Sequence, residues 1–139
     1  MSEKTEARRI EPAASAVSRP FWDATRDEQL VLQWCTRDNH AIFYPRETCP
    51  TCLRSDALEW RPASGKGTVY AVSVQHAPQI PLPAYEPPYA VAIVELEEGV
   101  RMMSTIVGTA PESVAVGQAV TVTWEPLSDG RNLPLFQPS

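Results

Sequence analysis

Histidine, cysteine and long hydrophobic runs are scarce in this sequence, and each shortage excludes a class of protein. The 139 residues contain two histidines and three cysteines. No run approaches the ~18 apolar residues that a membrane-spanning helix needs, and no apolar segment follows the N-terminus as in a secretory signal peptide. We therefore expect a cytoplasmic protein, in which an odd number of cysteines indicates metal or redox chemistry rather than a disulfide framework.

Basic residues are also scarce, but only in the second half of the chain. Residues 67–129 hold one basic residue against seven acidic ones, a net charge of −6, whereas residues 30–66 hold five against four, a net charge of +1. Binding to a phosphate backbone depends on its neutralisation by Lys and Arg. The second half is therefore a poor surface for nucleic acid.

The distribution of apolar residues divides the chain into four parts. Residues 1–17 are charged, rich in Ala and Ser and without periodicity, which predicts a flexible arm. Ser18 and Pro20 are typical of a helix start and predict an N-terminal helix over 18–29. Short apolar runs around two polar turns predict a zinc-ribbon-like module over 30–63, and the remainder, 64–139, reads as β structure throughout.

The last part predicts a small barrel. A proline-rich stretch, 77–88, cannot join a central strand because proline lacks the backbone N–H, so it forms a loop. Five strands with a break after the third match a Greek-key barrel of the OB type, which makes the chain mainly β. The expected strands are 68–75, 89–96, 100–107, 118–125 and 133–136.

A possible structural zinc site lies in the ribbon. Cys49 and Cys52 form a complete Cys-x-x-Cys turn, and a second turn begins at Cys35, but Asp38 stands where the fourth thiolate belongs. Three outcomes stay open at this point. Asp38 supplies an oxygen ligand, His40 supplies a nitrogen ligand, or the site has lost its metal and aromatic packing holds the ribbon.

The ordered set of motifs resembles a bacterial and archaeal family of acyl-CoA-associated OB-fold proteins, which began as a domain of unknown function with a rubredoxin-like ribbon before the barrel. The motifs that carry the resemblance are Pro20-Phe21-Trp22, Tyr44-Pro45-Arg46, Cys49-Pro50-Thr51-Cys52, Leu58-Glu59-Trp60, Ser64 to Tyr70, Pro88 to Ala92 and Val94-Glu95-Leu96.

The resemblance implies a partner subunit rather than a free enzyme. Such proteins bind a thiolase-like subunit and help to shape its acyl-CoA site, and some relatives are fused to MaoC-type enoyl-CoA hydratases. In steroid side-chain degradation, such a domain pairs with a sterol-carrier-protein-type thiolase homologue to form a retro-aldolase. The expected role is therefore a non-catalytic subunit of a thiolase, acyltransferase or retro-aldolase complex in a hetero-oligomer, with acyl-CoA as the ligand of the complex.

Two other functions are less compatible with the sequence. No Ser/Cys–His–Asp spacing surrounds either histidine, His40 or His76, so we expect no catalytic residue and no organic cofactor in the chain alone. A single-stranded nucleic-acid-binding OB module is the alternative function, and the net charge of −6 on the barrel argues against it.

Two sets of residues are candidates for contact with ligand and partner. The basic residues of the ribbon suit the phosphates of CoA, although for any single one of them a solvated surface charge is the favoured explanation; they are Arg46, Arg54, Arg61 and Lys66. Apolar residues of the helix and the proline-rich loop suit a partner or an acyl chain, although the loop equally suits a cap on the barrel; they are Phe21, Trp22, Ile80, Leu82, Tyr85 and Tyr89.

Overall fold

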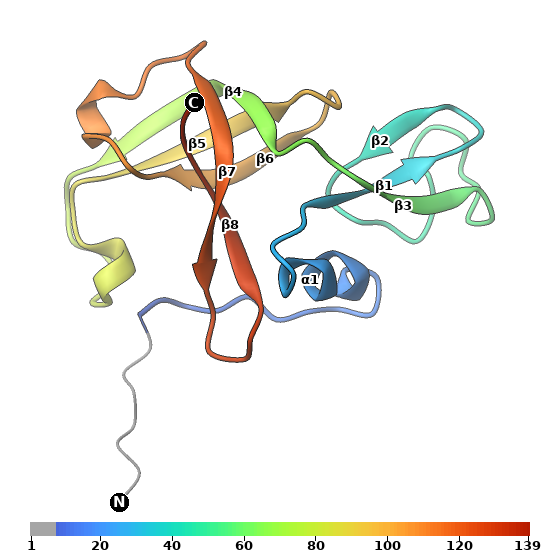
Figure 1. The fold of residues 1–139 in the computed structure, drawn as a ribbon, viewed down its shortest axis with the longest axis horizontal. Helices are drawn as coiled ribbons and strands as arrows, with labels where there is room; N and C mark the ends of the chain where they lie inside the picture. Colours follow the sequence, from blue (N-terminus) through green and yellow to red (C-terminus); the bar gives the residue numbers. More distant parts are fainter. Residues whose placement is uncertain (1–7) are drawn as a thin grey trace, which may run out of the picture.

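The computed structural model describes residues 8–139 and consists of a short helix, a three-stranded ribbon and a five-stranded barrel (Figure 1). These are the mainly β architecture and the strand number that the sequence predicts. The elements in chain order are α1 (Arg19–Thr25), β1 (Val31–Cys35), β2 (His40–Ile42), β3 (Leu58–Pro62), β4 (Lys66–Gln75), η1 (Pro83–Tyr85), β5 (Tyr89–Leu96), β6 (Arg101–Ile106), η2 (Pro111–Ser113), β7 (Ala119–Pro126) and β8 (Asn132–Pro138).

The ribbon sheet has the order β2-β1-β3, and both pairings are antiparallel. The side chain of Gln33 on β1 fixes the segment after β2, because its amide donates to the Arg46 carbonyl at 2.7 Å and accepts from the Arg46 N–H at 2.8 Å. These bonds satisfy a buried amide and hold the loop that leads to Cys49 against the sheet.

The barrel closes in the order β4-β5-β6-β8-β7. All its pairings are antiparallel except that of β6 with β8, which is parallel where Ile106 meets Phe136. Along β5 the burial alternates strictly, so that Ala90, Ala92, Val94 and Leu96 face the interior, as a period of two residues requires.

The ribbon and the barrel share one hydrophobic core. Leu32 and Ala41 from the ribbon and Phe21 from α1 belong to the same buried cluster as Val94 and Phe136 of the barrel. The joint predicted around Ser64–Gly67 is accordingly short, because β4 already begins at Lys66, immediately after Gly65. A second, small cluster of Cys35, Ile42 and Cys49 lies at the cysteine end of the ribbon.

Helix α1 is shorter than the predicted span of 18–29. The chain turns after Thr25, and Glu28 adopts a left-handed backbone conformation with φ of 54°, which ends the helix before Leu30 enters the ribbon. Among the residues described, no helix has the length and apolar character needed to cross a bilayer.

The segment before α1 is held against the barrel by polar contacts. Arg8 and Arg9 both pair with Glu125 on β7, and Glu11 accepts hydrogen bonds from the backbone and hydroxyl of Ser128. Residues 8–15 form neither helix nor strand. The arm predicted over 1–17 includes residues 1–7, which lie outside the described part of the chain, and its flexibility stays a prediction.

Candidate functional site

The two turns of the ribbon bring three thiols and one carboxylate together. One ligand atom from each of Cys35, Asp38, Cys49 and Cys52 lies within 4.8 Å of all the others. The Sγ atoms of Cys35 and Cys52 are 3.8 Å apart, and Asp38 Oδ2 lies 3.4 Å from Cys49 Sγ and 3.8 Å from Cys35 Sγ. The first turn is tight because Asn39 takes a left-handed conformation, with φ of 54°, before β2 begins.

These three distances are close to the edges of a zinc-centred tetrahedron, and the remaining pairs of ligand atoms lie within 4.8 Å. Bonds of about 2.3 Å to sulfur and about 2.0 Å to oxygen place sulfur atoms about 3.8 Å apart and a sulfur and an oxygen about 3.5 Å apart. Three thiolates and a carboxylate are ligands that zinc accepts. The four residues therefore fit a structural zinc ion, with Asp38 in the fourth position, which is the first of the three outcomes left open by the sequence.

Backbone N–H groups of the turns already favour ionised sulfur. Burial raises the pKa of the Cys49 thiol, but N–H groups of Cys52 and Thr51 outweigh burial and bring the pKa down to about 7. The N–H of Arg54 lowers the pKa of Cys52, but burial and the hydrogen bonds to Cys49, Cys35 and Asp38 raise it to about 11. Cys49 therefore loses its proton more readily than Cys52 does. A bound cation would remove this difference, because a thiol that coordinates a metal is deprotonated.

His40 lies beside this cluster but is not one of its four members. Its Nε2 is 3.7 Å from Cys49 Sγ and 3.8 Å from Asp38 Oδ2. The pKa of His40 is raised, chiefly by its hydrogen bond to the Ala41 carbonyl.

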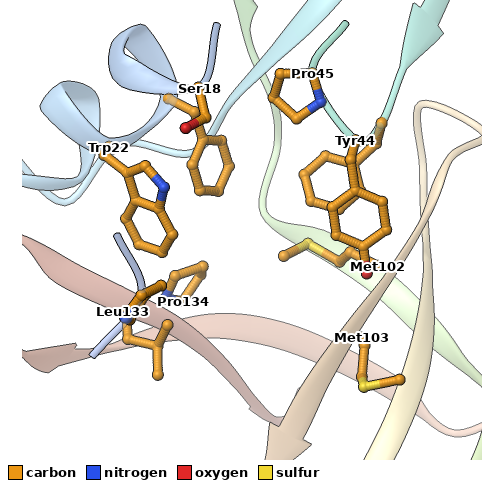
Figure 2. A pocket seen from close by; sticks show the side chains of 11 residues that line it. Ser18, Trp22, Tyr44, Pro45, Met102, Met103, Leu133 and Pro134 are labelled. Atoms are coloured by element: carbon orange, nitrogen blue, oxygen red, sulfur yellow. The ribbon is translucent and has the colours of Figure 1, made fainter. Parts of the chain in front are cut away.

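A second feature is an apolar groove of about 260 Å³ between the helix, the ribbon and the barrel (Figure 2). Phe21 packs edge-on against Trp22, with ring centroids 5.1 Å apart, and contacts Phe43 at 5.9 Å. Tyr44 and Met103 stand at the groove with 56% and 59% of their surface exposed. The full lining is Pro12, Ser18, Phe21, Trp22, Phe43, Tyr44, Pro45, Met102, Met103, Leu133 and Pro134.

The apolar residues predicted as one contact surface are separated into two. Phe21 and Trp22 line the groove. Ile80, Leu82 and Tyr85 line a different hollow of about 390 Å³ on the proline-rich loop, where the Tyr85 and Tyr89 rings lie 6.2 Å apart.

Sequence reasoning missed most of the groove. Tyr44, Met102, Met103, Leu133 and Pro134 come from three segments that only the fold brings together. The one available signal was Met103, an apolar residue whose neighbour Met102 already takes the inward position on β6.

The four predicted phosphate-binding cations do not form one cluster. Arg54 is bound to Asp56 at 2.6 Å, and this hydrogen bond lowers the pKa of Asp56 to about 2. Arg61 is paired with Glu59 and lies over the Trp34 ring at 4.8 Å.

Arg46 and Lys66 form no ion pair among the described residues. Arg46 lines a polar depression of about 440 Å³ between ribbon and barrel, together with His40 and Arg101. Lys66 lies in another depression, beside β7.

Comparison with protein families supports both modules. Residues 22–59 match the family described as the rubredoxin-like zinc ribbon domain of ChsH2, and residues 60–125 match the C-terminal OB-fold domain of ChsH2. Among solved structures, the chain is similar to a chain of the Ltp2-ChsH2(DUF35) aldolase, with a TM-score of 0.82 and 34% identity over 92% of this chain and 98% of that one. A Sulfolobus solfataricus protein of the DUF35 family shares the fold at a TM-score of 0.62 and 10% identity.

Curated relatives carry two kinds of name. The chain is 34% identical to the probable enoyl-CoA hydratase alpha subunit of Thermomonospora curvata over 99% of this chain and 42% of the relative. It is 32% identical to the 3-oxo-4,17-pregnadiene-20-carboxyl-CoA hydratase alpha subunit of Mycobacterium tuberculosis over 83% of this chain and 36% of the relative, so it spans about two fifths of the length of these two proteins.

The archaeal relatives are much closer in length. The chain is 33% identical to a DUF35 domain-containing scaffold protein of Methanocaldococcus jannaschii over 75% of this chain and 82% of that relative. The chain therefore belongs to the DUF35 family, and it carries the rubredoxin-like zinc ribbon and the OB-fold domain of ChsH2.

Proposed function

We propose that this chain is a non-catalytic partner subunit of an acyl-CoA enzyme complex, and that the catalytic partner is a thiolase-type subunit. The observation that carries the proposal is the match to nearly the whole ChsH2(DUF35) chain of an aldolase that also contains Ltp2. The hydratase alpha subunits and the archaeal scaffold proteins support it, because their names place this pair of modules in acyl-CoA enzymes or in a scaffolding role.

The chemistry of the described residues agrees with a supporting role. All three cysteines belong to the four-residue cluster that fits zinc, and His40 faces the same cluster. Among residues 8–139, the hydrogen bonds of the histidine rings go to a backbone carbonyl and a thiol, and no serine or threonine hydroxyl is paired with either ring. The described part of the chain therefore offers no activated hydroxyl nucleophile.

Two surfaces suit the two contacts that such a subunit makes. The aromatic groove beside Tyr44 and Met103 offers exposed apolar area of the kind that partner subunits bury. Arg46 has no acidic partner among the described residues and lines a polar depression, so it remains available to a phosphate of CoA. We assign the groove to the thiolase-type subunit and Arg46 to the CoA phosphates.

The test is co-expression of the chain with a thiolase-type protein from the same genome. We expect a stable hetero-oligomer by light scattering, with acyl-CoA thiolysis or retro-aldol cleavage in the complex and no turnover by the chain alone. Turnover by the isolated chain would contradict the proposal. Absence of any complex, combined with salt-dependent binding of single-stranded DNA, would favour the nucleic-acid alternative.

A further inference from the structure

The ring of His40 has the orientation of a metal-binding histidine, although Asp38 and not His40 is the fourth member of the cluster. His40 Nδ1 lies 3.0 Å from the Ala41 carbonyl oxygen. A carbonyl oxygen only accepts hydrogen bonds, so Nδ1 is the donor to Ala41, and Nε2 is the ring nitrogen left to face the cluster and to bind a cation when it carries no proton. Histidines that bind metals hold their second nitrogen in this manner, with its N–H donated to a carbonyl or carboxylate.

The Nε2 atom is directed at the cluster. Nε2 is 3.7 Å from Cys49 Sγ and 3.8 Å from Asp38 Oδ2. The Nε2–Sγ distance is close to the roughly 3.6 Å that separates nitrogen and sulfur ligands around tetrahedral zinc. An unprotonated Nε2, a carboxylate and a thiolate are all acceptors, and a cation between them satisfies all three.

Asp38 and His40 lie on the solvent side of the site, where Cys52 is also partly exposed. Cys35 and Cys49 are fully buried, whereas the side chains of Asp38 and His40 keep 27% and 36% of their surface exposed. A carboxylate is a harder ligand than a thiolate, and the set is otherwise sulfur. We therefore expect the bond to Asp38 to be the weakest of the four, and His40 Nε2 lies next to it as a second donor atom.

We propose that Asp38 and His40 share the fourth coordination position of the ribbon's metal ion. Asp38 holds the position in the present arrangement, and His40 Nε2 takes it when the carboxylate leaves. The three cysteines keep the ion throughout, so the exchange replaces one oxygen bond by one nitrogen bond. The inference concerns the metal site alone and does not depend on the proposed partner.

Metal binding by three variants and the unchanged protein tests the exchange. Asp38→Ala is expected to keep about one zinc per chain, with affinity within about tenfold of the unchanged protein, whereas Asp38→Ala/His40→Ala falls at least about tenfold below Asp38→Ala. Asp38→Ala/His76→Ala is the matched control, because His76 is the only other histidine and lies at the end of β4. Zinc content and competition with a chromophoric chelator give these values.

Cobalt substitution reports which atom binds. We expect Asp38→Ala to keep tetrahedral Co²⁺ absorption with shifted bands, and the double variant lacking His40 to lose it. Equal zinc affinity in Asp38→Ala and Asp38→Ala/His40→Ala would overturn the proposal.

A second comparison covers the case in which Asp38→Ala does not fold. Asp38→Cys restores a fourth thiolate, so His40→Ala should speed zinc loss to chelator by about tenfold in the unchanged background and leave it unaltered in the Asp38→Cys background. An equal effect in both backgrounds, or no effect in either, would also overturn the proposal.

Discussion

At the scale of single residues, Glu125 shows how one acid joins distant parts of the chain. Its carboxylate on β7 binds both Arg8 and Arg9, and its side chain is only 15% exposed. Burial raises the pKa of Glu125, but the hydrogen bonds from Arg8 and Arg9 outweigh it and hold the pKa below the ordinary value of 4.5. The ionised form is therefore the one that the folded state stabilises.

This lowered pKa predicts a pH-dependent effect of Glu125→Gln. The stabilisation is fully present above pH 4.5 and is lost as the pH falls through the lowered pKa of the folded state. We expect Glu125→Gln to reduce the free energy of unfolding by about 1 kcal/mol at pH 7, and the difference to shrink below pH 4.5. Urea unfolding of both proteins across this range measures it, and a difference that stays constant with pH would contradict the assignment.

At the scale of elements, the ribbon has two ends that are stabilised differently. Leu32 and Ala41 belong to the main core, whereas the cysteine end has only the small cluster of Cys35, Ile42 and Cys49. So few buried side chains do not hold two turns in place without a further constraint, and a structural metal provides one.

Metal removal should therefore loosen one end of the ribbon only. After treatment of the zinc-loaded protein with a chelator, we expect amide NMR signals of residues 35–58 to shift or broaden while those of the barrel strands keep their positions. Readdition of zinc should restore them. No spectral change would show that the metal does not stabilise the turns, and unfolding of the whole chain in a single step would show that its effect is not confined to one end of the ribbon.

The start of β4 is a second element whose sequence is tightly constrained. A Cβ atom on Gly67 would lie 2.5 Å from the Glu95 carbonyl oxygen and 2.9 Å from a Val94 methyl group. At this point β4 pairs with both β5 and β7, so the backbone has no room to withdraw.

Gly67→Ala should therefore destabilise the barrel by about 1–3 kcal/mol. The neighbouring exposed residue provides the control, because Thr68→Ala removes only surface atoms and should stay within about 0.5 kcal/mol. Thermal or urea unfolding of the two variants decides the matter. Equal stability of Gly67→Ala and Thr68→Ala would mean that the strands separate at no cost.

At the scale of the whole molecule, the groove exists because helix, ribbon and barrel share a core. Figure 2 shows Trp22 from α1, Tyr44 after β2, Met103 from β6 and Leu133 from β8 around one hollow. None of these elements forms the hollow by itself.

A charge placed in this groove should weaken assembly with the thiolase-type subunit. Met103 is exposed, so Met103→Glu should leave the fold intact and raise the Kd of the complex by about tenfold or more, since apolar anchors dominate interfaces. Val116→Glu is the control, because Val116 is 67% exposed and does not line the groove. Calorimetric titration compares them, and an equal loss of affinity in both variants would place the interface elsewhere.

Local sequence information predicted the elements well. The five barrel strands appear at the expected places because alternating apolar residues and turn residues act over a few neighbours. Helix α1 was predicted too long because the periodicity of 18–29 does not show the left-handed turn at Glu28.

The fourth metal ligand marks the limit of such information. Spacing identified Cys35, Cys49 and Cys52 but left Asp38, His40 and loss of the metal as alternatives, because Asp38 and His40 lie on the same turn. Only the closure of the turn places Asp38 Oδ2 against two thiols and directs His40 Nε2 toward the edge between Cys49 and Asp38.

The sequence by itself determined the order of the modules, the strands of the barrel and the three sulfur ligands, since these follow from periodicity and spacing along the chain. Only the tertiary structure shows that Asp38 joins the three cysteines in one cluster, that the four candidate cations lie apart, and that Trp22, Tyr44 and Met103 line one groove. The physical reason is that these features depend on distances between residues far apart in the sequence, which are fixed only when helix, ribbon and barrel pack into one core.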